Sequence, residues 1–279
     1  RNFRTQALVG GVDEETAFRA AISELLGRLT DWHKPAPIRR VLALHASQRA
    51  TSNTLALWEL VKAALPADME VQEICLRNGT MADCNGCSYT ACLHFGEQGG
   101  CFYGGPMVDE VYPAIRRCDA LVMLCANYND ALAANLTACI NRLTALFRQT
   151  RMYDKRLFGL VVSGYSGGDL LARQLISALN MNKSFFLPPH FCLLETANER
   201  GSLVKLPGID GRAAAFARRM AESGTRRFVL AHLSRENNTP ARALQTMETA
   251  LSGLPAAVEV APRGELSVCY EAEVTLCSA

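Results

Sequence analysis

Five short runs of mostly apolar residues recur along the chain, and each has the length of a β-strand: 41–46, 69–75, 120–126, 157–163 and 191–196. Between these runs, apolar residues follow helical spacing at about 54–65, 107–117, 131–150 and 167–182. A parallel strand connection needs a helix, so this alternation predicts an α/β fold with a doubly wound, five-stranded parallel sheet. Ligands of such sheets bind beyond the carboxyl ends of the strands, so the loops that follow the strands are expected to carry function.

Two segments flank this repeat. Apolar residues at helical spacing after Asp13 predict a capped helix over 13–30, and Pro35 and Pro37 separate it from the first strand. After a helix at 209–223, the pattern predicts a helix at 240–252 and strands at 228–234, 256–262 and 266–271. Three parts are therefore expected: an N-terminal helical extension (1–37), an α/β domain (38–224) and a small C-terminal α+β appendage (225–279).

The loop after the first strand, SQRATSNT, precedes a helix and is rich in hydrogen-bonding side chains. Free backbone N–H groups at a helix N-terminus attract anions, and hydroxyls with one arginine suit a phosphate. The polar residues of this loop are Ser47, Arg49, Thr51, Ser52, Asn53 and Thr54. The alternative is that Ser52 or Asn53 only caps the helix.

Two later loops are similarly placed. Tyr128 stands between two asparagines after the third strand and could lay a flat ring against a ligand, although Asp130 could also be an ordinary cap. After the fourth strand, SGYSGG contains glycines that let the backbone approach a ligand closely. Three such loops at corresponding places in the topology indicate one shared binding site.

Four of the eleven cysteines lie in one short segment: Cys84, Cys87, Cys92 and Cys101. Thiolates that converge from a compact loop bind an iron–sulfur cluster, and zinc accepts the same four ligands. Free or redox-active thiols are the remaining interpretation, and His94 inside the segment would support a ligand or lie at the surface. The cysteines within apolar patterns are expected to be small core residues: Cys75, Cys118, Cys125, Cys139 and Cys192.

These motifs, in this order, resemble the flavodoxin-like NAD(P)H-dependent FMN reductase family and its iron–sulfur flavoprotein branch. The resemblance covers about 39–223 and rests on S-x-R-x-x-S-N-T, C-x-G-C, N-Y-N-D and S-G-x-x-G-G. It implies that Ser47, Arg49, Ser52, Asn53 and Thr54 hold the FMN phosphate. It also implies that two loops line the flavin ring: Asn127, Tyr128, Asn129 and Asp130, with Ser163, Gly164, Tyr165, Gly167 and Gly168.

The resemblance implies a flavodoxin-like fold and a flavin-dependent oxidoreductase that passes electrons from NAD(P)H to a small-molecule or protein acceptor. A [4Fe–4S] cluster on the four cysteines, or zinc in its place, would accompany the FMN. A homo-oligomer, such as a dimer, is also implied. The alternatives are an electron-transfer carrier without its own substrate and a binding protein that has lost the flavin.

Composition and charge exclude several other classes. Of the 279 residues, 49% are hydrophobic and 20% are charged, which argues against disorder. The formal net charge of +2 gives no general attraction to nucleic acid or to a membrane, so neither is expected as a partner. The N-terminal residues lack the apolar stretch of a secretory signal, and a cytoplasmic location with reduced thiols is expected.

Three remaining residues have simpler interpretations or a separate resemblance. His45 and Trp58 are expected to be core residues. Residues 226–271 resemble the tail of a metallo-β-lactamase-fold hydrolase branch, in which His232 would be a metal ligand. One histidine cannot form a two-metal site, and H-x-H-x-D-H does not occur, so a structural appendage is expected there.

Overall fold

The computed structural model describes residues 7–8, 10–30, 36–47, 51–76, 79, 81–221, 227–230, 239–253 and 257–260. The chain forms two compact units, Arg1–Ala36 and Pro37–Ala279. The first unit contains α2 (Glu14–Thr30), which begins after Asp13 as predicted. The Asp13 carboxylate accepts a hydrogen bond from Thr16 N at 2.9 Å, as an N-cap residue does.

The second unit is built on one parallel sheet of five strands, and their bounds follow the apolar runs: β1 (Arg40–His45), β2 (Glu70–Cys75), β3 (Ala120–Ala126), β4 (Arg156–Ser163) and β5 (Cys192–Thr196). The strand order is β2-β1-β3-β4-β5, and every neighbouring pair is parallel. This order is that of the flavodoxin-like fold, which confirms the predicted fold class. All five carboxyl ends therefore lie at one edge of the sheet.

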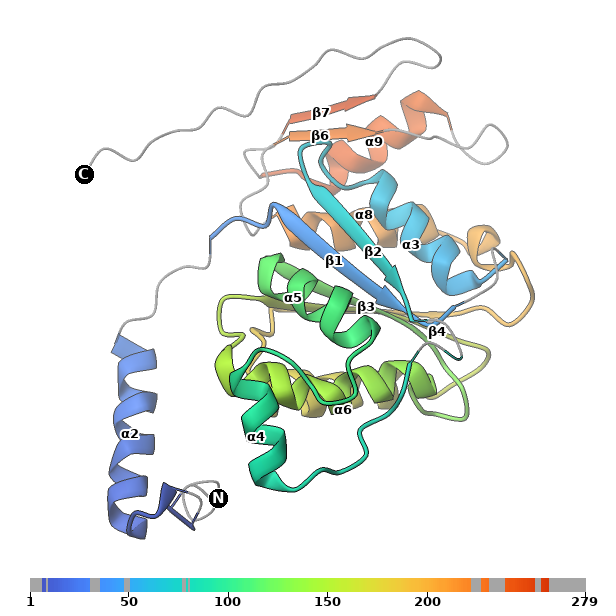
Figure 1. Ribbon diagram of the computed structural model, residues 1–279. Coiled ribbons are helices and arrows are strands. Elements are labelled where there is room, and N and C mark those ends of the chain that lie inside the picture. Colours follow the sequence, from blue (N-terminus) through green and yellow to red (C-terminus); the bar gives the residue numbers. More distant parts are fainter. Residues whose placement is uncertain are drawn as a thin grey trace. The chain divides into compact units, whose positions relative to one another are not determined.

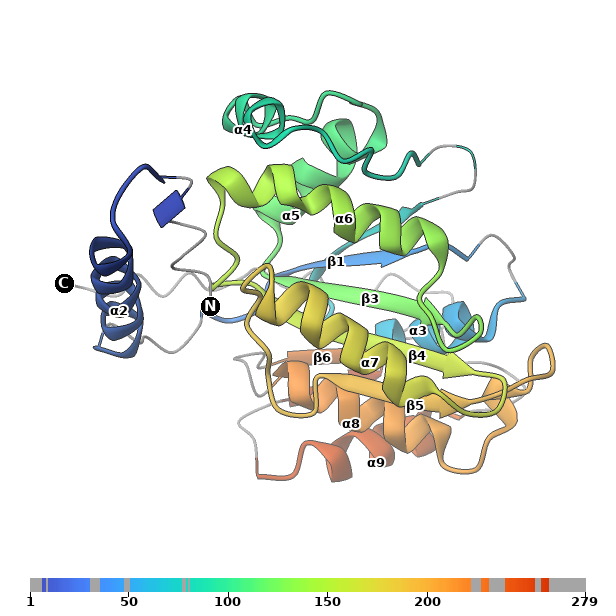
Figure 2. The same ribbon diagram turned by 90° about the horizontal axis from the view of Figure 1, so that it is seen from below.

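Helices cover both faces of this sheet (Figures 1 and 2). The residues of one core layer come from α5 (Tyr112–Arg117), α6 (Ala134–Gln149) and α7 (Gly168–Leu175). The opposite layer contains α3 (Asn53–Ala63) and α8 (Ile209–Ala221). Trp58 of α3 is fully buried, as expected, and Phe158 of β4 packs edge-on against Phe216 of α8.

Three short helical segments complete the connections: π-helical turns at Met107–Val111 and Ile176–Met181, and a 3₁₀ turn at Leu203–Lys205. The first leads directly into α5 and the second extends α7. Both lie inside predicted helical patterns, so the sequence indicated helix there but not its change of hydrogen-bond spacing.

A helix that the sequence analysis did not predict, α4 (Tyr89–Glu97), lies within the four-cysteine segment. Ser88 caps it by accepting a hydrogen bond from Ala91 N at 3.3 Å. Figures 1 and 2 show α4 packed on the outer side of α6, away from the sheet. The segment is therefore partly a packed helix, where a loop wrapped around a metal centre was expected.

The C-terminal residues add a small layer beside α8. Helix α9 (Pro240–Ala250) was predicted, and β6 (Arg227–Leu230) pairs in parallel with β7 (Ala257–Val260). A separate apolar cluster joins α9 to α8 and to the end of α3. His232 and the strand predicted at 266–271 lie outside the described residues.

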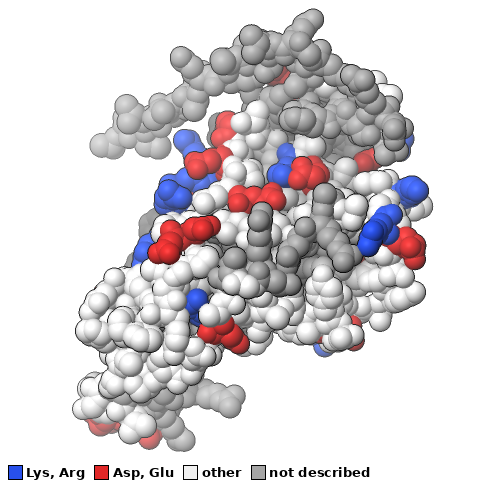
Figure 3. All heavy atoms as spheres, turned by 45° about the vertical axis from the view of Figure 1, so that its right-hand side comes forward, with Lys and Arg blue, Asp and Glu red and all other residues white. Residues whose placement is uncertain are grey.

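The described surface carries charges of both signs. On the face drawn in Figure 3, acidic and basic side chains are interspersed and neither sign gathers into a patch. None of the helices in the described ranges combines the length and apolar character needed to cross a membrane.

The packing of α4 can be tested with two glycines. A Cβ at Gly96 would lie 2.9 Å from Arg148 Cγ and 3.1 Å from the Ala145 carbonyl oxygen on α6. Glycine to alanine in a helix normally stabilises by about 1 kcal/mol, and overpacking costs about 1–3 kcal/mol. Gly96→Ala should therefore lower the free energy of unfolding by about 1 kcal/mol in urea denaturation.

Gly211→Ala on α8 is the matched control, because no atom lies within 4 Å of its Cβ position. This variant should raise the free energy of unfolding by up to about 1 kcal/mol. Equal stabilisation by both substitutions would contradict the close contact between α4 and α6.

Candidate functional site

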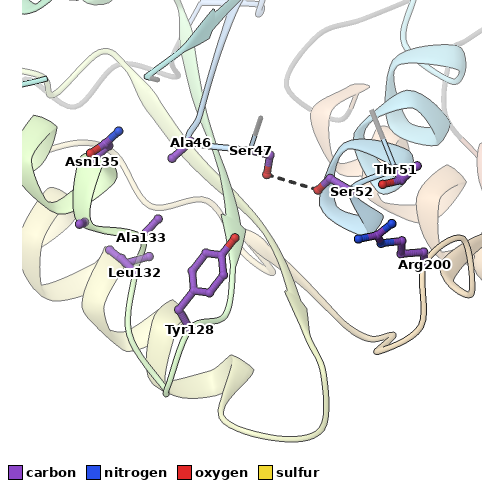
Figure 4. A pocket seen from close by; sticks show the side chains of 10 residues that line it. Ala46, Ser47, Thr51, Ser52, Tyr128, Leu132, Ala133, Asn135 and Arg200 are labelled. Atoms are coloured by element: carbon purple, nitrogen blue, oxygen red, sulfur yellow. Dashed lines mark hydrogen bonds between the residues drawn. The ribbon is translucent and has the colours of Figure 1, made fainter. Parts of the chain in front are cut away.

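A cavity of about 670 Å³ lies at the carboxyl edge of the sheet. Its lining comes mainly from the loops after β1 and β3, which are neighbours in the sheet. The chain crosses from one side of β1 to the other between β2 and β3, so this is the topological switch point where α/β sheets bind ligands. Figure 4 shows the lining side chains: Ala46, Ser47, Thr51, Ser52, Tyr128, Leu132, Ala133, Asn135 and Arg200.

One wall of the cavity can bind an anion. Ser52 caps α3, and its hydroxyl also donates a 3.3 Å hydrogen bond to the hydroxyl of Ser47. Thr51 and Arg200 lie beside Ser52 (Figure 4). Backbone N–H groups at the start of α3, three hydroxyls and a guanidinium together suit a phosphate group. Capping and anion binding are thus compatible roles for Ser52.

Arg200 was not among the predicted residues, and it comes from the loop after β5. Asn53 holds this loop in place by donating to the carbonyl oxygens of Ala197 at 3.0 Å and Glu199 at 2.8 Å. The Asn53 carbonyl oxygen also accepts from Gly201 N at 3.1 Å. The amide of Asn53 therefore cross-links α3 to the residues on both sides of Arg200.

Two other residues predicted for the phosphate have different positions. Thr54 is buried and does not line the cavity, and Arg49 lies outside the described residues. The structure thus brings Ser47 and Ser52 to the cavity, whereas it uses Asn53 to hold a neighbouring loop. The phosphate contacts implied for Arg49, Asn53 and Thr54 stay predictions.

The opposite wall is flat and more apolar. Tyr128, with 59% of its surface exposed, lies with Leu132 and Ala133 on the side facing Ser52 (Figure 4). The ring is held by a tight turn, because Tyr128 and Ala131 pair through both backbone hydrogen bonds. Asn129 and Asp130 form the tip of the turn with φ of 54° and 60°. Asparagine and aspartate tolerate this left-handed conformation better than most residues do.

Asn127 joins this turn to the loop after β4. Its amide nitrogen donates to Ser163 Oγ at 3.1 Å and to the Ser166 carbonyl at 2.8 Å, while its oxygen accepts from Asp130 N at 2.8 Å. Gly167 completes the contact, since a Cβ there would lie 1.7 Å from Asp130 Oδ1. The two loops predicted to line a flavin ring are therefore fastened together.

The remaining residues predicted in the loop after β4 are not on the cavity wall. Ser163 is buried under the Asn127 amide, and Gly168 begins α7. Tyr165 is 81% exposed and its hydroxyl accepts a hydrogen bond from Asn198 at 3.1 Å. An added Cβ at Gly164 would meet Asn198 Oδ1 at 3.0 Å. Ring contacts from Ser163, Gly164, Tyr165 and Gly168 stay predictions.

A polar network lies beneath the loop after β1. Buried His45 places Nδ1 3.1 Å from the Ser47 carbonyl oxygen and Nε2 3.3 Å from Glu73 Oε1. Trp58 Nε1 donates to Glu73 at 2.9 Å, and the Lys62 ammonium lies 3.3 Å from the same carboxylate. Burial lowers the pKa of His45, although Glu73 opposes this shift. Burial opposes ionisation of Glu73, but Trp58 and Lys62 outweigh it and lower its pKa.

The four clustered cysteines do not converge. Cys84 and Cys87 are exposed, whereas Cys92 and Cys101 are half-buried, and all four are free thiols. Across the part of the chain that the structure describes, no three His, Cys, Asp or Glu side chains are arranged to hold a metal ion. An iron–sulfur cluster or zinc needs several thiolates around one point, so this arrangement does not fit either group.

Comparison with protein-family models identifies NADPH-dependent FMN reductase over residues 39–199, more than half of the 279 residues. The chain belongs to the NADPH-dependent FMN reductase family. It is accordingly an NAD(P)H-dependent oxidoreductase of flavodoxin-like fold. The matched range contains β1 to β5 and ends one residue before Arg200.

Comparison with solved structures finds matches of low sequence identity. The Trp repressor binding protein of Bacillus subtilis is 17% identical and the match covers 63% of this chain and 96% of that one, with a TM-score of 0.42. A putative quinone reductase from Klebsiella pneumoniae is 15% identical over 72% and 90% of the two chains, with a TM-score of 0.49. An FMN-dependent NADH-azoreductase from Bacillus anthracis is 11% identical over 67% and 98%, with a TM-score of 0.44. A comparison with curated protein sequences finds no match.

Sequence reasoning missed two features, one of the cavity wall and one beneath the loop after β1. Arg200 follows the fifth strand, so the rule applied to the other strands would have pointed to its loop. The contact of Glu73 with His45 had no such signal, because β2 also contains Glu70 and Gln72 and an acidic residue on an edge strand is ordinarily solvated.

The contact between the two loops predicted to line a flavin ring can be tested at Gly167. Alanine there faces two costs: a φ of 79°, which costs about 1–2 kcal/mol for residues with a Cβ, and collision with Asp130, which adds about 1–3 kcal/mol. Gly167→Ala should therefore lower the free energy of unfolding by about 2–5 kcal/mol. Urea denaturation measures this change.

Gly201→Ala is the matched control, since its φ of 69° is similar but no atom lies within 4 Å of its Cβ. This variant should show only the backbone cost. Adding Asp130→Ala to Gly167→Ala should recover part of the loss. Equal costs at the two glycines, or no recovery, would mean that the loops are not in contact as described.

Proposed function

We propose that the cavity binds FMN and that the protein passes electrons from NAD(P)H to an acceptor, which is a small molecule or another protein. The observation that carries the proposal is the division of the cavity into a wall that suits an anion and a wall with an aromatic ring. FMN has the same division, since a phosphate ends a chain attached to a flat ring system. The volume is also within the range of cofactor pockets.

The chain's own residues would bind and position the cofactor. The hydroxyls of Ser47, Thr51 and Ser52 would donate hydrogen bonds to the phosphate at the start of α3, and Arg200 would add a charged donor. The Tyr128 ring would lie against the flavin and shield one side of it from water. Asn127 would support that ring by holding its turn against the loop after β4.

FMN supplies the hydride-accepting ring when it is bound, and the protein supplies binding, orientation and electrostatics. Among the described residues that line the cavity, none is a histidine, aspartate, glutamate or cysteine. The lining thus suits cofactor binding without a general acid or base from the protein. The cysteine segment has no part in this proposal, and the homo-oligomer implied by the resemblance stays a prediction.

The proposal is tested by reconstituting the protein with FMN without oxygen and adding NADH or NADPH. We expect one FMN to bind per chain and the visible flavin absorption to bleach on mixing with at least one of the nucleotides. Bound flavin that bleaches only with a chemical reductant such as dithionite would favour an electron carrier. Failure to bind FMN would overturn both the reductase and the electron-carrier interpretation, and would favour a binding protein that uses no flavin.

Arg200 provides a sharper test, because riboflavin is FMN without the phosphate. A hydrogen bond to a charged group contributes about 1.5–3 kcal/mol, and each 1.4 kcal/mol is about tenfold in affinity. Arg200→Ala should therefore weaken FMN binding about 10- to 100-fold and leave riboflavin binding within about twofold. Fluorescence titration with both flavins measures the two constants.

Arg173→Ala removes an exposed guanidinium on α7 outside the cavity and should change neither affinity. An equal loss for both flavins in Arg200→Ala would show that the arginine supports the loop and does not bind the phosphate. Absence of binding to either flavin in the unchanged protein would count against the flavin site itself.

A further inference from the structure

The cysteine segment is held by α6 at both ends. The buried guanidinium of Arg142 donates to the Gly104 carbonyl at 2.7 Å and approaches the Ala82 carbonyl at 3.4 Å. Its backbone carbonyl accepts from the Tyr112 hydroxyl at 2.6 Å. Arg142 therefore joins the residues just before Cys84 to those just after Cys101.

Within the segment, C-N-G-C (84–87) is fixed on its N-terminal side. Asp83 Oδ1 accepts hydrogen bonds from Asn141 on α6 at 2.9 Å and from Cys84 N at 2.6 Å. The hydrogen bond from Asn141, followed by that from Cys84 N, lowers the pKa of Asp83. The backbone at Cys84 is thus tied to the middle of α6.

The C-terminal side of the same four residues is fixed as well. Cys87 immediately precedes Ser88, the N-cap of α4. Helix α4 packs on α6, where the Arg148 guanidinium lies 4.6 Å from the Tyr89 ring centre. Both ends of C-N-G-C are therefore anchored on one helix, and Gly86 turns the chain between them with a φ of 65°.

The environment of these two thiols differs from that of the other cysteines. Cys84 and Cys87 are exposed, and Cys87 lies directly before the N-cap of α4. Burial raises the pKa of Cys118, Cys139 and Cys192 to about 12, so these thiols stay protonated and unreactive. Among these five described cysteines, only Cys84 and Cys87 are exposed.

We propose that Cys84 and Cys87 form a reversible dithiol–disulfide centre that is separate from the flavin cavity. The oxidant is a low-molecular-weight disulfide. The Cys87 thiolate attacks one of its sulfur atoms and releases one thiolate, which forms a mixed disulfide. Cys84, after losing its proton to solvent, attacks the Cys87 sulfur and releases the second thiolate. Two protein thiols are oxidised to one disulfide, and one external disulfide is reduced to two thiols.

The centre lies along α6 from the cavity. Asn135 lines the cavity near the start of α6, and Asn141, which holds Asp83, is six residues later on the same helix. Six residues of an α-helix rise about 9 Å along its axis. Neither Cys84 nor Cys87 is among the residues that line the cavity, and the proposed exchange with a small disulfide uses no flavin.

The test uses the full chain, purified without oxygen and equilibrated with mixtures of reduced and oxidised glutathione. After an acid quench, free thiols are counted in denaturant and the peptides are mapped by mass spectrometry. We expect a loss of two thiols per chain with rising oxidised glutathione, and a peptide in which Cys84 is joined to Cys87. Addition of reduced glutathione should restore both thiols.

Four serine variants identify the pair. Cys84→Ser and Cys87→Ser should each abolish the two-thiol loss, whereas Cys92→Ser and Cys101→Ser should retain it. Unchanged urea denaturation of the exposed-site variants shows that they are folded. Retention of all thiols at every glutathione ratio would overturn the proposal, as would a disulfide to Cys92 or Cys101. Stoichiometric iron or zinc that is lost in Cys84→Ser would also overturn it, in favour of a metal centre.

Discussion

The site depends on two asparagine side chains that satisfy loop backbone groups beyond the ends of the strands. In the sheet, neighbouring strands satisfy each other's N–H and C=O groups, but the loops after the carboxyl ends have no such partner. Asn53 takes this role for the loop after β5, and Asn127 takes it for the loop after β4. A primary amide both donates and accepts, so one side chain can fix two or three backbone groups at once.

These two cross-links explain why the cavity has two unlike walls. Asn53 begins α3 and holds the loop that carries Arg200, so the cation lies beside the hydroxyls at the helix N-terminus. Asn127 fastens the Tyr128 turn against the glycine loop, so an exposed ring is held in place. The His45 and Glu73 pair adds support below, because His45 contacts the carbonyl of Ser47 itself. These hydrogen bonds thereby fix the loops on both sides of the cavity relative to the sheet.

The sheet could be predicted because its central strands are buried on both faces and are read as nearly continuous apolar runs. The position of the cavity could also be predicted, because ligands of α/β sheets bind beyond the carboxyl ends of the strands. That rule needs only the order of the strands and helices along the chain. The roles of Asn53 and Asn127 could not be predicted from the sequence. An asparagine side chain after a strand can form hydrogen bonds with a ligand or with the backbone of a loop, and the sequence does not distinguish the two. Arg200 depends on a contact between residues 144 positions apart, which no local pattern encodes. Helix α4 was missed because its cysteines and glycines suggested a wrapping loop.

Helix α4 also explains why the four clustered cysteines do not form one metal site. A cluster would require Cys92 to turn toward the exposed pair, but Cys92 belongs to a helix whose Gly96 packs tightly against α6. Moving Cys92 would break that contact, whereas Cys84 and Cys87 are anchored without being buried. The C-terminal layer does not alter this division, since α9 packs on α8 and on the end of α3 that points away from the cavity. The edge proposed to bind flavin is therefore shaped by β1 to β5 and their loops, and the thiols belong to an outer layer carried by α6.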